Sequence, residues 1–232
     1  MLKLLSDNSG FCTIYEAKDQ QNKGKILKVL NQDNPKAIEI FKEKAKVLAS
    51  FNHSGIPSID GYFTHSLKAQ QVLHCLVMEK VEGLNLQQWL EQKNKNKPIS
   101  EELAQDWLRQ IAEILKIVHD KNWLHRDIKP TNIMLRYPLP SSSPFQKRRL
   151  KGNLVLIDFG TAREMTGTYL AKIAGDISMT SINSIGFTPK EQIDGKAIPQ
   201  SDFYGLGRTL VYLLTATVPT DFEVDPNTLR LL

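Results

Sequence analysis

The most specific segment of this 232-residue chain reads His125-Arg126-Asp127-Ile128-Lys129-Pro130-Thr131-Asn132. It gathers a histidine, an aspartate, a lysine and an asparagine, and a second polar segment, Asp158-Phe159-Gly160, begins 26 positions after Asn132. The apolar run Leu-Val-Leu-Ile at residues 154–157 stands directly before Asp158 and is typical of a short buried strand. The pattern therefore places one carboxylate at the end of a predicted strand and another in a polar segment upstream of it.

The first 80 residues predict a small sheet that carries one helix. Four runs have strand-like composition and are separated by turn signals, at residues 11–17, 25–30, 59–63 and 72–78. Asn34 and Pro35 form a good helix start, with asparagine as the N-cap and proline at the first helical position. Apolar residues then recur at helical spacing to about Ser50, so we expect one amphipathic helix between the second and third strands.

Beyond Gly83 the pattern becomes mainly helical. Three helices are predicted, at residues 84–91, 100–118 and 201–215. Ser100 is a suitable N-cap for the longest of them, and Glu101 and Glu102 suit the positive end of its dipole. The side chains expected to face inward from the last helix are those of Leu206, Leu210, Leu213 and Leu214.

The two polar segments resemble the catalytic loop (H-R-D-x-K-x-x-N) and the metal-binding D-F-G of protein kinases. With residues 158–164 and 168–172 they look most like eukaryotic-type Ser/Thr kinases of bacteria, particularly cyanobacterial ones, and the resemblance covers nearly the whole chain. It implies an α+β, two-lobed fold. The N-lobe, residues 1–82, would hold a small antiparallel sheet and one long helix, and the C-lobe, residues 83–232, would be mainly helical. The family's last C-lobe helices are missing, so we expect a C-terminally truncated kinase domain or a fragment of a longer protein.

The resemblance also assigns chemical roles. Asp127 matches the catalytic base, which accepts or orients the proton of the substrate hydroxyl, and Lys129 would lie beside the transferring phosphate. Asn132 and Asp158 would hold Mg²⁺, a hard ion that prefers oxygen ligands. His125 is a buried scaffold residue in the family rather than an acid or a base. The implied cofactors are ATP and Mg²⁺, and the implied partner is a protein substrate.

Four further residues are expected at the nucleotide. Lys28, on the run at residues 25–30, matches the lysine that contacts the α- and β-phosphates of ATP. Met78 resembles the gatekeeper, and Glu79 and Val81 would offer backbone groups to adenine at the hinge. These hinge contacts are made by backbone atoms and do not depend on particular side chains. The residue types at Glu79 and Val81 are therefore weak evidence for adenine binding.

The predicted ATP-covering lobe departs from the family pattern in two ways. The places of the three loop glycines hold Asp7, Ser9 and Cys12, although glycine would let backbone amides approach phosphate. The place of the helix glutamate that pairs with Lys28 holds Lys44, which would repel Lys28. Glu43 points about 100° away from Lys44 around the helix, so it could replace that glutamate only if the helix rotates or bulges.

Other features of the predicted C-lobe concern regulation. Glu191 is retained from the A-P-E anchor of the family, and residues 138–152 are an insertion in a surface loop. Arg126 is the arginine that can pair with a phosphorylated activation segment. Ser184 aligns with the substrate-facing Ser/Thr near the catalytic base. Candidate phosphosites are Thr166, Thr168, Ser178, Thr180, Ser181 and Ser184.

The composition, 41% hydrophobic and 24% charged, is ordinary for a soluble globular protein. The net charge is +5, but lysines are interleaved with acids and no aromatic-plus-basic stripe occurs, so we expect no nucleic-acid partner. The dense basic cluster Lys147-Arg148-Arg149 is interpreted as a solvated loop. No apolar run approaches the roughly 18 residues of a membrane span. Cys12 and Cys75 are too few for a disulfide framework, which favours a reducing cytosol.

We interpret the chain as a serine/threonine protein kinase that transfers the γ-phosphoryl of Mg-ATP to a protein hydroxyl. The complete set of Asp127, Lys129, Asn132 and Asp158 supports this hypothesis. The alternative is a pseudokinase or signalling scaffold, which the replaced glycines and Lys44 favour. A small-molecule kinase of the same fold is a third and weaker interpretation. Oligomeric state is left open.

Overall fold

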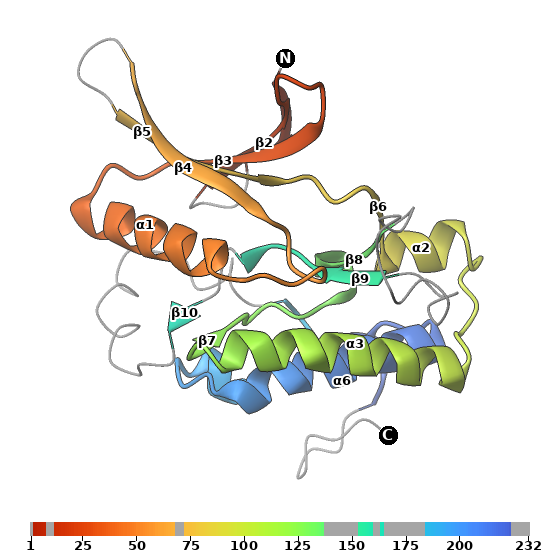
Figure 1. Cartoon of the computed structure of the whole chain (residues 1–232). Helices are drawn as coiled ribbons and strands as arrows, with labels where there is room; N and C mark the ends of the chain where they lie inside the picture. The colour runs from red at the N-terminus through yellow and green to blue at the C-terminus, as the bar shows by residue number, and fades with distance from the viewer. Residues whose placement is uncertain are drawn as a thin grey trace. The chain divides into compact units, whose positions relative to one another are not determined.

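A computed structural model of the chain describes residues 2–7, 12–67, 72–136, 153–159, 163–164 and 184–223. The chain divides into two compact units, Met1–Val81 and Glu82–Leu232 (Figure 1). Several predicted features lie outside the described residues: Ser9, Gly160, the insertion at residues 138–152 with its basic cluster, and every candidate phosphosite except Ser184.

The first unit contains one antiparallel sheet with the strand order β1-β2-β3-β5-β4. Its strands are β1 (Lys3–Ser6), β2 (Cys12–Lys18), β3 (Gly24–Leu30), β4 (Ile59–Ser66) and β5 (Val72–Glu79). The last four match the four predicted strands. The strand β1 was not predicted, because it has four residues and pairs only with β2 at the edge of the sheet.

The helix α1 (Pro35–Ala49) packs against β4 of the same unit. The Asn34 side chain accepts a hydrogen bond from the Ala37 amide at 2.8 Å, as an N-cap should. The buried face of the helix carries Phe41, whose ring meets the edge of the Tyr62 ring with centroids 6.2 Å apart. Helical periodicity and cap chemistry therefore predicted this helix correctly.

The second unit is built from four helices and two small sheets among its described residues. The helices are α2 (Leu86–Gln92), α3 (Glu101–His119), α5 (Lys190–Ile193) and α6 (Pro199–Thr215), with 3-10 turns η2 (Pro130–Asn132) and η5 (Pro219–Asp221). One sheet has the order β6-β8-β9, from Gly83–Asn85, Ile133–Arg136 and Asn153–Leu156, and the other pairs β7 (Trp123–Leu124) with β10 (Arg163–Glu164).

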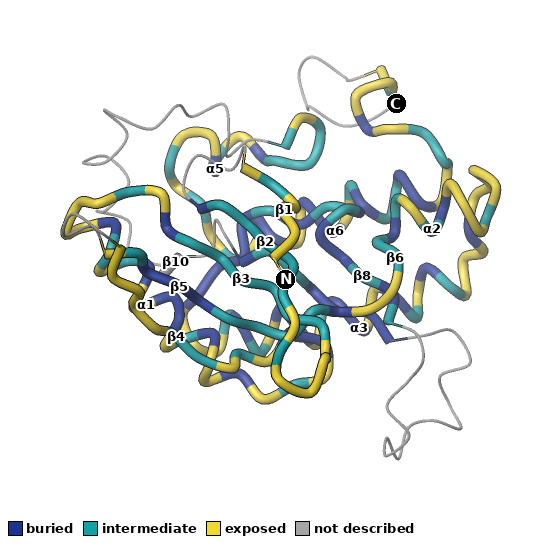
Figure 2. Tube along the Cα trace, turned by 90° about the horizontal axis from the view of Figure 1, so that it is seen from above, coloured by how far each residue is buried: buried dark blue, intermediate teal, exposed yellow. Residues whose placement is uncertain are grey.

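The core of this unit lies where α3 and α6 run side by side (Figures 1 and 2). The inward face of α3 is apolar and at most 1% exposed at Trp107, Ile111, Leu115 and Val118. The α6 face is buried at Leu206 and Leu213, but Leu214 is 38% exposed, contrary to prediction. Adjacent helical residues point about 100° apart, so Leu213 and Leu214 cannot both face α3.

The start of the second unit also corrects the sequence prediction. Leu84 and Asn85 belong to β6 rather than to a helix, because β6 pairs with β8, and Asn85 then caps α2. Gly83 has φ +148°, and a Cβ at this position would lie 2.1 Å from the Leu135 carbonyl oxygen. Only glycine allows the two strands to approach so closely at this point.

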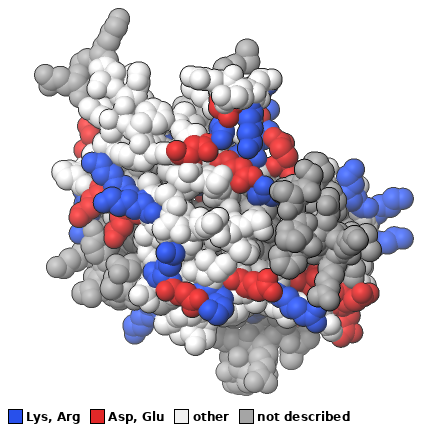
Figure 3. Space-filling model, in the orientation of Figure 1, with Lys and Arg blue, Asp and Glu red and all other residues white. Residues whose placement is uncertain are grey.

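Positive and negative side chains are intermixed on the described part of the face shown in Figure 3. Separately, the first unit contains the ion pairs Lys25–Asp60, at 2.5 Å, and Lys80–Glu16, at 2.7 Å. Among the helices that the described residues form, none combines the length and apolar character needed to cross a membrane.

Candidate active site

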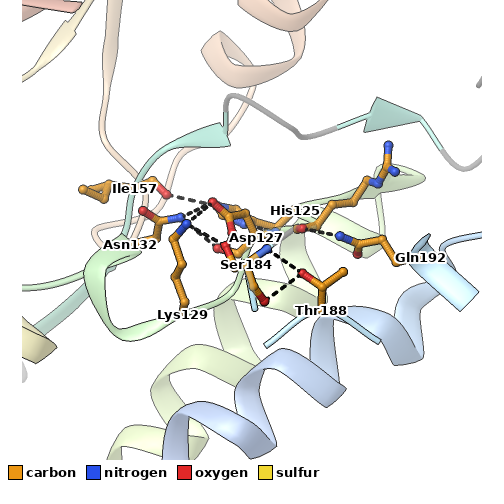
Figure 4. A network of polar contacts seen from close by, with 9 residues as sticks. His125, Asp127, Lys129, Asn132, Ile157, Ser184, Thr188 and Gln192 are labelled. Atoms are coloured by element: carbon orange, nitrogen blue, oxygen red, sulfur yellow. Dashed lines mark hydrogen bonds and ion pairs between the residues drawn. The ribbon is translucent and has the colours of Figure 1, made fainter. Parts of the chain in front are cut away.

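The Asp127 carboxylate is the centre of a polar network in the second unit (Figure 4). Lys129 Nζ lies 2.9 Å from Asp127 Oδ2, and Ser184 Oγ donates to Asp127 Oδ1 at 2.7 Å. Lys129 Nζ also donates to Ser184 Oγ at 2.7 Å, so one hydroxyl is held between a carboxylate and an ammonium. Asp127 and Lys129 were predicted together from the sequence, and the structure brings them into direct contact.

Asn132 supports the same carboxylate from the 3-10 turn η2. Its Nδ2 donates to the Asp127 carbonyl oxygen at 2.9 Å and to Asp127 Oδ2 at 2.7 Å. Both Asp127 oxygens are acceptors, so the Asn132 side-chain amide must point its nitrogen toward them. Its Oδ1 then remains available as an acceptor. The Asn132 carbonyl oxygen also accepts from the Ile157 amide at 2.9 Å, which ties the turn to the chain just before Asp158.

The backbone that carries Asp127 is held from α6. Asp202 is 1% exposed, and its two carboxylate oxygens accept the amides of His125 at 3.0 Å and Arg126 at 2.7 Å. Arg126 has φ +69°, a left-handed conformation that costs an L-residue about 1–2 kcal/mol. Charge-assisted hydrogen bonds to a buried carboxylate offset that strain. The carboxylate of Asp202 therefore determines the path of the chain immediately before Asp127.

Close packing brings α6 to this loop. A Cβ at Gly205 would lie 2.8 Å from the Ile128 carbonyl oxygen and 3.0 Å from Ile128 Cβ. A side chain at this position would push the helix away from the loop and lengthen the hydrogen bonds of Asp202, which lies one turn earlier on α6.

His125 is fully buried and acts as a scaffold, as the resemblance implied. Its Nε2 donates to the Ile157 carbonyl oxygen at 3.0 Å, and its Nδ1 accepts from the Asp127 amide at 3.3 Å. These two contacts require the neutral imidazole with its proton on Nε2. Burial lowers the pKa of His125, although the nearby charges of Asp202 and Asp127 oppose that shift. The ring also packs edge-on against Phe159.

Asp158 follows the strand β9 and, like Arg126, has a left-handed backbone, with φ +61°. Together with Asn132 Oδ1 it could supply two oxygen ligands to a hard cation. The described residues contain no group of three or more His, Cys, Asp or Glu side chains that could hold a metal by themselves. Two protein oxygens nevertheless fit Mg²⁺, which keeps several waters and is often held by one or two protein groups plus substrate phosphates.

The residues expected at the nucleotide lie in the first unit. Lys28 is half-buried on β3, opposite Ile14 of β2 and Leu76 of β5. Met78 and Glu79 end β5, and Val81 is buried just beyond them. The Glu79 amide donates to the Ser58 carbonyl oxygen at 2.8 Å. That amide is therefore already engaged within the first unit.

The structure describes residues at both departures from the family pattern, the one at the helix glutamate and the one at the loop glycines. On α1 Lys44 is 6% exposed, whereas Glu43 lies on the exposed side of the helix. The helix runs unbroken from Pro35 to Ala49, so no rotation or bulge brings Glu43 to the buried face. At the loop positions, Asp7 is exposed and Cys12 is 8% exposed at the start of β2.

The segment that follows Ser184 is anchored within the same unit. The Ser184 amide donates to Thr188 Oγ1 at 2.9 Å, and Thr188 Oγ1 donates back to the Ser184 carbonyl oxygen at 3.2 Å. Ser201 Oγ donates to Glu191 Oε1 at 2.9 Å. Gln192, which is 5% exposed, donates from Nε2 to the Arg126 carbonyl oxygen at 2.7 Å. The retained glutamate and its neighbour thus attach this segment to α6 and to the loop.

A model of the protein kinase domain matches residues 9–229 of the chain, which is nearly all of it. The chain belongs to the protein kinase family. The kinase domain is 33% identical over 231 residues to the serine/threonine-protein kinase PknA of Nostoc sp., covering 95% of this chain and 37% of that protein. It is 31% identical to the serine/threonine-protein kinase D of Synechocystis sp., covering 95% of this chain and 41% of that protein.

A relative outside the cyanobacteria is the serine/threonine-protein kinase PrkC of Bacillus subtilis, which is 28% identical over 221 residues. The alignment covers 92% of the kinase domain and 30% of PrkC. The chain thus spans about two fifths or less of the length of these curated relatives. The cyanobacterial resemblance inferred from the sequence is confirmed by these matches.

Sequence reasoning missed two residues of the kinase domain that support the loop, Asp202 and Gln192. Asp202 did leave a signal, since it lies four positions before Leu206 and therefore on the predicted buried face of an apolar helix. An acidic residue on such a face needs a buried partner. Gln192 left no comparable signal, because the short helix α5 has too few residues to show a periodicity.

Proposed function

We propose that this kinase domain is a serine/threonine protein kinase that transfers the γ-phosphoryl group of ATP to a hydroxyl of a protein substrate. The observation that carries the proposal is the hydroxyl of Ser184, held 2.7 Å from both Asp127 Oδ1 and Lys129 Nζ. A carboxylate and an ammonium that converge on one hydroxyl are the groups needed to orient a nucleophile and to neutralise charge as the phosphoryl group moves.

In this mechanism Asp127 orients the substrate hydroxyl and accepts its proton. Asn132 and Lys129 donate to Asp127 Oδ2, so Oδ1 is the oxygen directed to a hydroxyl. Lys129 then stabilises negative charge on the transferring phosphate. Asn132 and Lys129 form no covalent bond with the substrate, which agrees with a reaction that depends mainly on positioning and electrostatics.

We assign the nucleotide and metal roles as the sequence predicted them. Mg²⁺, when bound, neutralises charge on the phosphates, and Asn132 Oδ1 and the Asp158 carboxylate are the groups that would hold it. Lys28 would contact the α- and β-phosphates. Met78 would be the gatekeeper, and Glu79 and Val81 would offer backbone groups to adenine. The first unit would then be the ATP-covering lobe, and the second unit would carry the catalytic loop.

The setting of this activity is also part of the proposal. Neither Cys12 nor Cys75 forms a disulfide in the structure, and both are buried. Buried thiols without disulfides are typical of proteins in a reducing cytoplasm. We therefore expect a cytoplasmic protein substrate, and we expect ATP to come from the same compartment.

The test is transfer of labelled γ-phosphate from Mg-ATP to the protein itself and to a generic basic protein. The Asp127→Asn variant keeps the size of the side chain but removes the base, and we expect it to lose about 10²–10⁴-fold in rate. The control is Asp120→Asn, because the Asp120 side chain forms an exposed ion pair with Lys116 within the described part of the chain. Folded wild-type protein without transfer would contradict the proposal and favour the pseudokinase alternative, for which ATP binding would be measured next.

A further inference from the structure

The segment at residues 184–192 contacts the catalytic loop at two separate points. Its first residue, Ser184, contacts Asp127 and Lys129. Its last residue, Gln192, donates from Nε2 to the Arg126 carbonyl oxygen at 2.7 Å. Figure 4 shows Ser184 and Gln192 together with Asp127. One short segment therefore touches both the catalytic carboxylate and the backbone immediately before it.

The second contact acts on a strained residue. Arg126 has φ +69°, and its amide is held by Asp202 Oδ1 at 2.7 Å. The peptide between Arg126 and Asp127 is held at both of its polar atoms, since Gln192 binds its carbonyl and His125 Nδ1 accepts its amide at 3.3 Å. The orientation of that peptide plane determines the direction in which the Asp127 side chain leaves the backbone.

We propose that Gln192 is a positioning residue that orients Asp127 through the Arg126 carbonyl, so that docking of the segment at residues 184–192 is coupled to the alignment of the catalytic carboxylate. This inference rests on the proposed kinase function. Gln192 does not contact the reacting atoms itself. Because Gln192 is 5% exposed, water cannot readily replace its amide at the Arg126 carbonyl. Loss of the amide removes this hydrogen bond from the Arg126 carbonyl and weakens the restraint on the peptide.

The competing interpretation is that Gln192 only anchors the short helix α5. Loss of the amide would then lower the stability of the second unit without changing the turnover of the molecules that remain folded. Gln110 offers a matched control for this effect. It is also buried, at 4% exposed, and its side chain accepts the Leu154 amide at 3.0 Å rather than contacting the Arg126 turn.

The experiment compares Gln192→Leu, Gln192→Glu and Gln110→Leu with the wild-type chain. For each protein the folded fraction is measured first, and then kcat, the KM for ATP and the KM for a protein substrate. The Gln192→Glu variant is measured between about pH 8.5 and about pH 6, because a protonated carboxyl can donate to the Arg126 carbonyl and an ionised one cannot. The ionisable groups around this turn are those of Arg126, Asp127, His125, Glu191, Asp202 and its partner His119.

We expect Gln192→Leu to lower kcat by about 10- to 100-fold with little change in the KM for ATP. The kcat of Gln192→Glu, divided by the wild-type kcat at the same pH, should rise at least about threefold as the pH falls. This ratio cancels the pH dependence that both proteins share. Gln110→Leu should lose stability but keep its kcat. If Gln192→Leu does not fold, the pH ratio of Gln192→Glu decides the matter.

Wild-type kcat in folded Gln192→Leu, or a ratio for Gln192→Glu that does not change with pH, would overturn the inference. Amide hydrogen exchange on peptides containing Arg126 and Asp127 provides a readout that does not depend on catalysis. Exchange there should be faster in Gln192→Leu than in Gln110→Leu, and equal rates would also overturn it. A wild-type chain without phosphotransfer would refute the proposed function, while hydrogen exchange would still test the role of Gln192.

Discussion

Asp202 on α6 accepts the backbone amide of Arg126, which lies 76 residues earlier in the chain, at a distance of 2.7 Å. The same carboxylate accepts the His125 amide at 3.0 Å and contacts His119 Nε2 at 2.8 Å. The Asp202 side chain is almost completely buried, so water cannot readily replace these contacts. A helix that contains no proposed catalytic group thus determines where the chain enters the catalytic loop.

We predict that Asp202→Asn lowers the free energy of unfolding by about 2–4 kcal/mol, because the new amide nitrogen faces a backbone donor inside the core. Phosphotransfer should fall as well. The measurement is urea denaturation, with Asp120→Asn as a control that should change the free energy of unfolding by less than about 0.5 kcal/mol. Equal effects of the two substitutions would contradict a special role for the buried carboxylate.

Replacing two glycines of α6 by alanine should change the stability of the domain in different ways. Gly205→Ala should destabilise the domain by about 1–3 kcal/mol, since its Cβ would approach the Ile128 carbonyl oxygen to 2.8 Å. At Gly207 no atom of the described residues lies within 4 Å of the place of its Cβ, so Gly207→Ala should be neutral or stabilising by up to about 1 kcal/mol. Thermal denaturation of both variants checks the pair. A stable Gly205→Ala variant would mean that α6 does not press on the loop.

The buried His125 should make the domain less stable in mild acid. Burial lowers the pKa of His125 below the ordinary value of 6.5, so the folded chain resists a proton that the unfolded chain binds. The stability that the domain gains from neutral, buried His125 is therefore fully present above about pH 6.5. It is lost as the pH falls from there toward the lowered pKa of His125. The measurement is the free energy of unfolding between about pH 7.5 and about pH 5.5.

The control for that measurement compares His125→Gln with His65→Gln, in which an exposed histidine is replaced. His125→Gln should be less stable than wild type at neutral pH, but its free energy of unfolding should change less with pH. The His65 variant should keep the wild-type slope. Identical slopes in all three proteins would show that another group causes the acid sensitivity.

Ser184 should be required for its hydroxyl rather than for its size. Ser184→Ala removes the hydrogen bonds to the Asp127 carboxylate and from the Lys129 ammonium, and bonds to charged groups contribute about 1.5–3 kcal/mol each. We therefore expect at least about a tenfold loss of phosphotransfer, with Ser184→Thr close to wild type. Steady-state kinetics of both variants would check this, and a fully active alanine variant would rule out the role.

Local sequence information predicted most elements of the fold. The helices α1 and α3 were identified from their apolar spacing and from their caps Asn34 and Ser100, because both signals act within one or two turns. Predictions failed where distant pairing decides the conformation. Leu84 and Asn85 became a strand only because β8 pairs with them, and the edge strand β1 needed β2.

The candidate site divides in the same way. The segments at 125–132 and 158–160 resemble two protein-kinase motifs, and that resemblance was sufficient to identify the family, which the match over residues 9–229 confirms. The roles of Asp127, Lys129, Asn132 and Asp158 follow from the same resemblance and stay predictions. The alignment of the carboxylate was decided by tertiary structure. Asp202 and Gln192 bind backbone atoms of a strained turn from elements more than 60 positions away. Backbone acceptors and donors carry no residue identity, so nothing in the loop's own sequence could reveal which buried side chains hold it.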